Sequence, residues 1–165
     1  MKRIGLVLGA ALLLAVPASA AVITKTATTA TYKLTLDVGP LETMYTQAQV
    51  DAKHPKTGEV MIDTGMGGMS MGDMKMAAGN RHLEVHIASR VTGKAVSGLM
   101  PTISLEDTGG MPMAMSSKVD VVEMEGIGQG MSDLHYGNNV KLTGGHTYKV
   151  VVTVKGEKAS FTFRA

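Results

Sequence analysis

The chain lacks cysteine and tryptophan, and only four tyrosines and two phenylalanines occur among its 165 residues. Without cysteine there is neither a disulfide framework nor a thiol for a lipid anchor. Charge is also balanced: Lys2 and Arg3 belong to the N-terminal leader, so 16 − 2 = 14 basic residues face 14 acidic ones in the remainder. This balance excludes the basic footprint of a nucleic-acid-binding protein.

The first 20 residues have the pattern of an export signal. A basic start is followed by an apolar run over residues 4–16 that is too short to span a bilayer, and then by the cleavage motif Ala-Ser-Ala at 18–20. No later apolar run has the length of a membrane span. We therefore expect a mature chain of 165 − 20 = 145 residues that begins at Ala21, forms one domain and resides in the periplasm or outside the cell.

Short alternating segments predict strands throughout the mature chain, and no long segment has a helical period. Residues 21–31 are Thr- and Ala-rich and are expected to form a flexible lead before a single domain at 32–165. The predicted strands are 32–38, 44–52, 59–63, 81–89, 102–106, 118–124, 146–155 and 158–164. Such short strands with regular turn signals indicate an all-β fold, an antiparallel immunoglobulin-like β-sandwich of seven to nine strands.

The segment R-H-L-E-V-H-I-A-S at 81–89 alternates strictly between polar and apolar residues. As a strand it turns Leu83, Val85 and Ile87 to a core. The opposite face then carries three metal-competent side chains, His82, Glu84 and His86. Side chains on one strand face stand about 6.6 Å apart, so two can bind one ion while the third supports them. The alternative is a solvated sheet face on which these side chains only pair with neighbours.

A second histidine-bearing segment, M-S-D-L-H-Y-G-N-N at 131–139, follows three closely spaced glycines. We expect a loop at one end of the sandwich, where binding residues are commonly mounted. This loop can bring His135 and Met131 to the polar face just described. His146, at the start of a later strand, is a further candidate, whereas His54 lies in the turn H-P-K-T-G and is interpreted as solvated.

The methionines are unusually numerous, 14 in all, and five lie in the Gly-rich segment 65–76. These five are Met66, Met69, Met71, Met74 and Met76. A loop so rich in glycine has no packing need for five thioethers, and thioether sulfur selects Cu(I), so we interpret the segment as a second, Cu(I) site. Met111, Met113 and Met115 repeat the M-x-M spacing. The alternative for both clusters is apolar packing.

Three segments together resemble the bacterial periplasmic Fe2+ transport protein family, whose members accompany iron permeases. They are H-L-E-V-H-I at 82–87, S-D-L-H-Y-G-N-N-V-K at 132–141, and the Gly-Gly-led strand that follows. The resemblance implies an immunoglobulin-like sandwich that dimerises and binds copper, with Fe2+, Mn2+ and Zn2+ as alternatives. It also implies His82 and Glu84 as strand ligands, His135 as the loop ligand and Met131 as the nearest methionine.

The motif departs from the family in the loop. One residue separates Asp133 from His135 where the family has two, and the family's additional downstream histidine has no evident counterpart. The fourth ligand therefore stays open, with His86 and His146 as alternatives. The implied function is metal uptake or homeostasis, with a membrane iron permease as the partner.

Two rival classes complete the sequence-based hypotheses. The pentapeptide G-M-S-M-G at 68–72 matches the nucleophile motif G-x-S-x-G, but it lacks the preceding strand and the following helix that place such a serine. We therefore expect no enzyme. A structural or adhesive sandwich without metal is the other alternative, because a fold does not imply a function.

Overall fold

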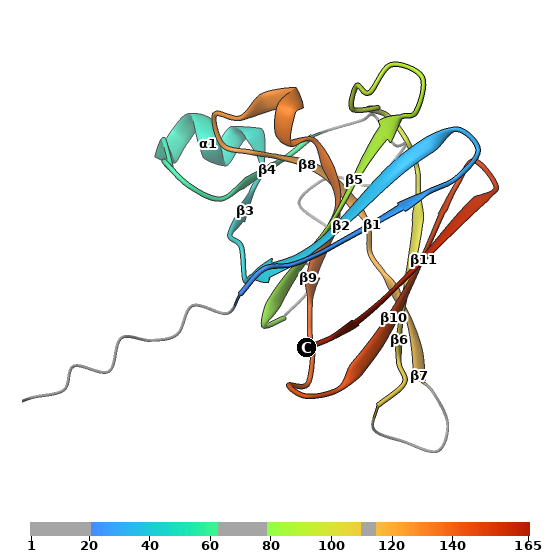
Figure 1. The fold of residues 1–165 in the computed structure, drawn as a ribbon. Coiled ribbons are helices and arrows are strands. Elements are labelled where there is room, and N and C mark those ends of the chain that lie inside the picture. Colours follow the sequence, from blue (N-terminus) through green and yellow to red (C-terminus); the bar gives the residue numbers. More distant parts are fainter. Residues whose placement is uncertain (1–20, 63–78, 110–114) are drawn as a thin grey trace, which may run out of the picture.

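The computed structural model describes residues 21–62, 79–109 and 115–165, which form two β-sheets that pack against each other (Figure 1). The large sheet has the order β1 (Ile23–Thr28), β2 (Tyr32–Pro40), β5 (Arg81–Ser89), β9 (His135–Val140), β8 (Val122–Gly126), β4 (Glu59–Met61) and β3 (Met44–Tyr45). The small sheet has the order β11 (Glu157–Arg164), β10 (Thr147–Val154), β6 (Thr102–Asp107) and β7 (Met115–Val119). All pairs are antiparallel except β3 with β4.

The predicted all-β sandwich is confirmed. Its core lies between the sheets and is built by the alternating apolar residues of the long strands, which include Leu34, Leu36, Val85, Val150 and Val152, each fully buried. A smaller cluster of Met44, Met61, Val122 and Met124 packs at the β3–β4 end of the large sheet. Three methionines thus act as ordinary core residues. None of the helices in the described residues is long and apolar enough to cross a membrane.

The described residues contain eleven strands where seven to nine were expected. One reason is the segment 21–31, which was wrongly expected to be a flexible lead. Residues 23–28 form β1 and pair with β2, and Ile23 and Ala27 pack against the core while the three residues between them are exposed. A second reason is the predicted strand 118–124, which is divided between β7 and β8 at Asp120.

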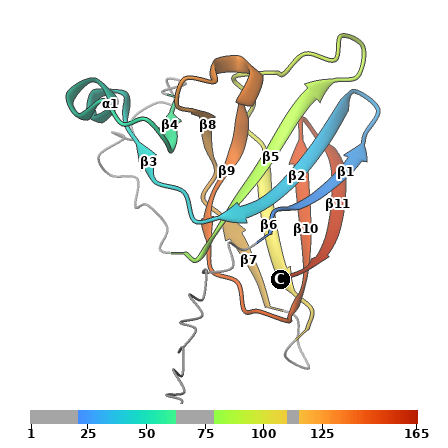
Figure 2. The same cartoon turned by 60° about the vertical axis from the view of Figure 1, so that its left-hand side comes forward.

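The predicted strand 44–52 is also wrong, because only Met44–Tyr45 is extended and α1 (Gln47–Lys53) follows. Thr46 begins this helix with a capping box: its side chain accepts from the Gln49 amide, and the Gln49 side chain accepts from the Thr46 amide. Local capping therefore overrides a weak alternating pattern. In both views α1 lies beside β3 and β4 at one end of the large sheet (Figure 2).

The segment 131–139 does not form one loop as expected. It begins in the 3-10 helix η1 (Gly130–Asp133) and continues as β9, which lies between β5 and β8 in the middle of the large sheet. Every residue of β9 is buried. The second histidine motif is therefore mounted on a central strand and not on a loop.

Candidate metal centre

Strand β5 carries the first half of the site. Leu83, Val85 and Ile87 are at most 1 % exposed and belong to the core, as the alternation predicted. The opposite face of the large sheet, here called the outer face, therefore carries His82, Glu84 and His86. The register pairs Glu84 with Asp37 of β2 on one side and with Gly137 of β9 on the other.

Strand β9 brings His135 to the same face. Gly137 allows the two strands to approach, because a Cβ atom at this position would lie 1.8 Å from the Leu83 carbonyl oxygen. No side chain fits there, which explains the glycine of the H-Y-G motif. The neighbouring Tyr136 points into the core, where its hydroxyl donates to the Val96 carbonyl and accepts from the Leu99 amide.

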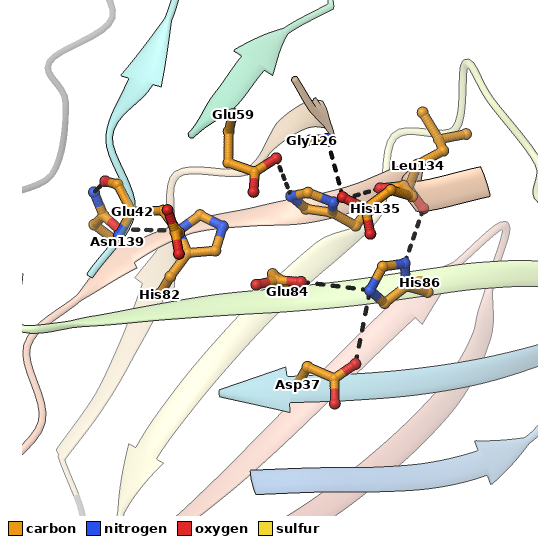
Figure 3. Close-up of polar contacts among 11 residues, drawn as sticks. Asp37, Glu42, Glu59, His82, Glu84, His86, Gly126, Leu134, His135 and Asn139 are labelled. Carbon is orange, nitrogen blue, oxygen red and sulfur yellow. Dashed lines mark hydrogen bonds and ion pairs between the residues drawn. The ribbon is translucent and has the colours of Figure 1, made fainter. Parts of the chain in front are cut away.

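Three imidazoles meet on the outer face as a result. The ring centroid of His135 lies 5.7 Å from that of His82 and 5.4 Å from that of His86. His82 and His135 have no exposed surface, and His86 is partly exposed. Figure 3 shows the three rings around Glu84, with a ring nitrogen of each turned toward the others. We call His82, His86 and His135 the three-histidine site.

Each of the three rings is oriented by a hydrogen bond through Nδ1. For His82 the partner is the side-chain oxygen of Asn139, at 2.9 Å. The Asn139 amide group itself donates to the Glu42 carbonyl, which fixes which of its atoms is the oxygen. His82 must therefore carry its proton on Nδ1, and the lone pair is on Nε2.

The same tautomer follows for the other two rings. Nδ1 of His135 lies 2.7 Å from the Asp133 carbonyl oxygen, and Nδ1 of His86 lies 3.2 Å from that of Leu134. A carbonyl oxygen can only accept, so both Nδ1 atoms donate. Metal-binding histidines are commonly held this way, with one ring nitrogen bonded to an oxygen and the other left for the ion.

The free nitrogens of the two buried rings have no partner. Nε2 of His82 and Nε2 of His135 are inaccessible to solvent and make no hydrogen bond among the described residues. Oε2 of Glu59 is in the same situation and lies 3.6 Å from Nε2 of His135. Two acceptors that face each other in a buried position need a proton or a cation between them, because an unsatisfied buried polar atom is costly.

Carboxylates complete the donor set. Ligand atoms of Glu84, His86 and His135 all lie within 4.8 Å of one another, and so do those of Glu59, Asp133 and His135. Two nitrogens bound to one tetrahedral ion at about 2.05 Å stand roughly 3.3 Å apart, so the side chains of either group have to move closer together to share an ion. Nε2 of His82 belongs to neither group. The Asp133 carboxylate already accepts from the Gly126 amide, which favours Glu84 and Glu59 as the acids of the site.

The pKa values reflect crowding of like charges in a buried place. Burial, together with the nearby carboxylates of Glu84, Asp133 and Glu42, raises the pKa of Glu59 to about 7. Burial likewise lowers the pKa of His135, which keeps this ring neutral and its lone pair available. With His135 neutral, no positive charge of the protein lies between its Nε2 atom and the Glu59 carboxylate, and a bound cation would supply one.

Glu84 and His86 form a local ion pair. Burial by itself would raise the pKa of Glu84, but the His86 ring beside it holds that pKa below its usual value. Burial by itself would lower the pKa of His86, but Glu84 at 3.4 Å and Asp37 at 3.7 Å raise it. The protonated form of His86, which carries a proton on Nε2 as well as on Nδ1, is thus favoured. A metal ion that binds to Nε2 of His86 must displace the proton there.

The other predicted site residues lie elsewhere. Met131 is 51 % exposed and lines a hollow with Met61 and Glu123 that none of the three histidines borders, so its role as a ligand stays a prediction. His146 is bonded to Asp107 on the small sheet at 2.8 Å. His54 ends α1 as an exposed residue, in agreement with the expected solvated position. The Met-rich segment 65–76 and residues 111–113 lie outside the described residues, and Met115 begins β7.

Sequence reasoning missed Glu59 and Asn139. Glu59 is 7 % exposed and begins the short strand β4, which stands over His135 in Figure 3. In the sequence it is one acid before an apolar run, and the histidine that precedes it, His54, lies in a turn that was interpreted as solvated. Asn139 lay within the quoted motif but was not interpreted as a support for His82. Its position directly opposite His82 emerges only from the β5–β9 register.

Comparison with known proteins supports the fold. No protein-family model matches the chain, and no curated protein matches its sequence significantly. Among solved structures the chain is similar to as-isolated FetP of uropathogenic Escherichia coli strain F11, recombinantly expressed in the periplasm of E. coli BL21(DE3). The match has a TM-score of 0.52 and 14% identity, and it covers 88% of this chain and 97% of the FetP chain. At this identity the likeness shows a shared fold.

Proposed function

We propose that this chain is a periplasmic protein that binds one divalent metal ion at the three-histidine site. The ligands are Nε2 of His82, His86 and His135, with the carboxylates of Glu84 and Glu59 as oxygen donors. A site of nitrogen and oxygen ligands without cysteine suits copper, zinc, iron or manganese. The proposed role, uptake or homeostasis of the metal, rests on the family resemblance and on the distant relation that the FetP-like fold supports.

The observation that carries the proposal is the pair of buried, unpartnered Nε2 atoms of His82 and His135. A merely structural histidine in a core uses both ring nitrogens or leaves one in water. Here three rings are each held through Nδ1 by a neutral oxygen. Nε2 of His86 lies beside the Glu84 carboxylate and Nε2 of His135 beside that of Glu59, while Nε2 of His82 is buried without a partner among the described residues. This is the arrangement that a cation satisfies.

Copper is the proposed ion with the highest intrinsic affinity. Among divalent first-row ions the affinity of a nitrogen and oxygen site rises to Cu2+ and falls again at Zn2+. Copper binding in vitro therefore tests the site but does not identify the metal used in the cell. Cu(I) binding by the five methionines of segment 65–76 and a dimeric state are further proposals.

The experiment is expression of the full chain with its own leader, purification from the periplasm, and metal analysis followed by thermal melts. A ligand that binds only the folded state raises the melting temperature, by an amount that grows with the ratio of its concentration to Kd. We expect copurified metal and a higher melting temperature with Cu2+, Zn2+, Mn2+ or Fe2+. No copurified metal and no shift with any of the four ions would instead favour the adhesive sandwich.

A further inference from the structure

A hollow of about 380 Å³ lies on the outer face of the large sheet beside the three-histidine site. Its lining is formed by side chains of β1, β2 and β5 and by the turn after β5. The residues are Thr28, Lys33, Thr35, His86, Ala88, Ser89, Arg90 and Gly93. The register explains this grouping, because Lys33 is opposite both Thr28 and Ala88, and Thr35 is opposite His86. The ring of His86 therefore belongs to both the hollow and the metal centre.

The lining carries positive charge and hydroxyl groups but no carboxylate. Lys33 is exposed and makes neither a salt bridge nor a side-chain hydrogen bond within residues 21–62, 79–109 and 115–165. Arg90 is held in place because one guanidinium nitrogen, Nη1, donates to the carbonyl oxygens of Thr29 at 2.8 Å and Ala30 at 3.2 Å. Its charge is thus fixed at the hollow, and the Lys33 ammonium is free to contact a ligand.

The chemistry of the lining selects the class of ligand. Ammonium, guanidinium and hydroxyl groups donate hydrogen bonds to oxyanions, and charge-assisted bonds of this kind are the strong ones. Another hollow, of about 670 Å³, provides a contrast: its lining includes Glu123 and Glu125 and no basic residue. Of the two hollows, only the one beside His86 has the charge to attract an anion.

We propose that this hollow binds a small polyvalent oxyanion directly beside the metal centre, so that the protein handles its metal together with an anionic partner. The inference rests on the proposed function, because His86 joins the two sites. The volume of the hollow lies near the lower end of the roughly 300–1,000 Å³ that small-molecule sites occupy. This size suits an anion that carries two or three carboxylates or a phosphate. Two kinds of ligand present such anionic oxygen atoms: a carboxylate chelator of the metal and free inorganic phosphate.

The test is titration of the metal-free full-length protein with citrate and, separately, with inorganic phosphate, followed by calorimetry and by amide chemical shifts. We expect binding with shift changes at Lys33, Thr35 and Ser89. Lys33→Gln should weaken it at least about 10-fold, because it removes a charge-assisted hydrogen bond. Lys25→Gln removes the same charge from β1 and should leave the affinity unchanged, because Lys25 is opposite Leu36 and faces away from the outer face.

Further measurements separate this inference from the metal site. Lys33→Gln should bind Zn2+ as wild type does when no anion is present, whereas His135→Ala should lose Zn2+ and still bind the anion. Citrate binding at these residues would identify a carboxylate chelator, and phosphate binding without citrate binding would identify a free inorganic anion. No binding of either anion, or equal losses in Lys33→Gln and Lys25→Gln, would overturn the proposal even if metal binding is intact.

Discussion

The part of the chain that the structure describes contains two imidazole–carboxylate groupings, and they differ in which ring nitrogen the acid contacts. On the small sheet, Nδ1 of His146 lies 2.8 Å from the Asp107 carboxylate, and the ring stacks on Tyr148. Asp107 also accepts from the Gly109 amide, and both side chains are about 30 % exposed. In the three-histidine site Nδ1 always contacts a neutral oxygen, and it is Nε2 of His86 and of His135 that lies beside carboxylates.

This difference shows what distinguishes a binding site from an ordinary ion pair. The His146–Asp107 pair is satisfied by itself and by water, so it gains little from a cation. Between Glu59 and His135 a buried carboxylate oxygen faces a buried ring nitrogen without a hydrogen bond. This pair therefore needs a proton or an ion between its two acceptors, and we expect substitutions to affect metal binding at this site alone.

The largest expected effect is that of His135→Ala, because His135 belongs to both groups of ligand atoms that can hold one ion. We expect at least about a 100-fold loss in affinity for Cu2+ and for Mn2+ by calorimetric titration, more than the usual loss for a supporting residue. His146→Ala and His54→Ala are the matched controls and should bind both ions as wild type does.

His135 is fully buried, so its removal can also disturb the fold. Circular dichroism of the variant and a parallel titration of His86→Ala, at a partly exposed position, separate the two effects. Wild-type affinity in a folded His135→Ala, or an equal loss in His146→Ala, would contradict the assignment.

The next effect is expected from Glu59, which sequence reasoning did not select. Glu59→Gln keeps the size of the side chain and removes the negative charge that faces Nε2 of His135. We expect a loss of metal affinity of about 10 to 100-fold. Asp107→Asn makes the same chemical change in the His146–Asp107 pair and should leave the metal affinity unchanged. If both variants bound metal as wild type does, Glu59 would be a structural residue only.

A smaller effect, about 10-fold, is expected for Asn139→Leu, since a residue that orients a ligand contributes less than the ligand. The substitution removes the acceptor that holds the proton of His82 on Nδ1. His82 can then adopt the other tautomer, which places a proton where the metal binds. Calorimetry at several pH values is the measurement, and an unchanged affinity would show that packing alone orients the ring.

Much of the fold and half of the site were readable from the sequence. The alternation in 81–89 correctly placed Leu83, Val85 and Ile87 in the core, because a strand admits only one register once one face is apolar. The three polar side chains of that strand were therefore assigned to the correct face. The motif also led us to expect His135 beside them, and its ring centroid lies 5.7 Å from that of His82 and 5.4 Å from that of His86.

The rest depended on pairings that the sequence does not display. The stretch G-N-N at 137–139 has the composition of a turn, yet it lies in a central strand. Asn138 is compatible with burial because its amide group donates to the Asp120 carbonyl and its oxygen accepts from the Asn139 amide. On the core face of β9 the polar Asn138 stands between Tyr136 and Val140, and the outer face is polar, so no continuous hydrophobic alternation marks the strand.

The smallest expected effect is on stability without metal. The pKa of Glu59 is raised to about 7 from 4.5, so its protonated form stabilises the fold. This contribution is complete below about pH 4.5 and is lost as the pH rises through 7. Relative to Glu59→Gln, the melting temperature of the metal-free wild type should fall between pH 5 and pH 8. A constant difference would contradict the raised pKa.

Asp107 should show the opposite sign. Its hydrogen bond from His146 holds its pKa below the usual 3.8, so its contribution is present above that value and is lost only as the pH falls below it. Thermal melts of Asp107→Asn should therefore differ from wild type in their pH dependence only in the acid range. A difference that changes between pH 5 and pH 8 would count against this assignment.

The most direct test of the metal centre is long-range nitrogen–proton NMR of the histidine rings during titration with Zn2+, a diamagnetic ion. Such spectra report the protonation of each ring nitrogen directly. If the ion binds as proposed, the Nε2 signals of His82, His86 and His135 shift together and saturate at one equivalent, while those of His54 and His146 do not respond. Shifts at His146 or His54, or no shift at His82 and His135, would contradict this proposal.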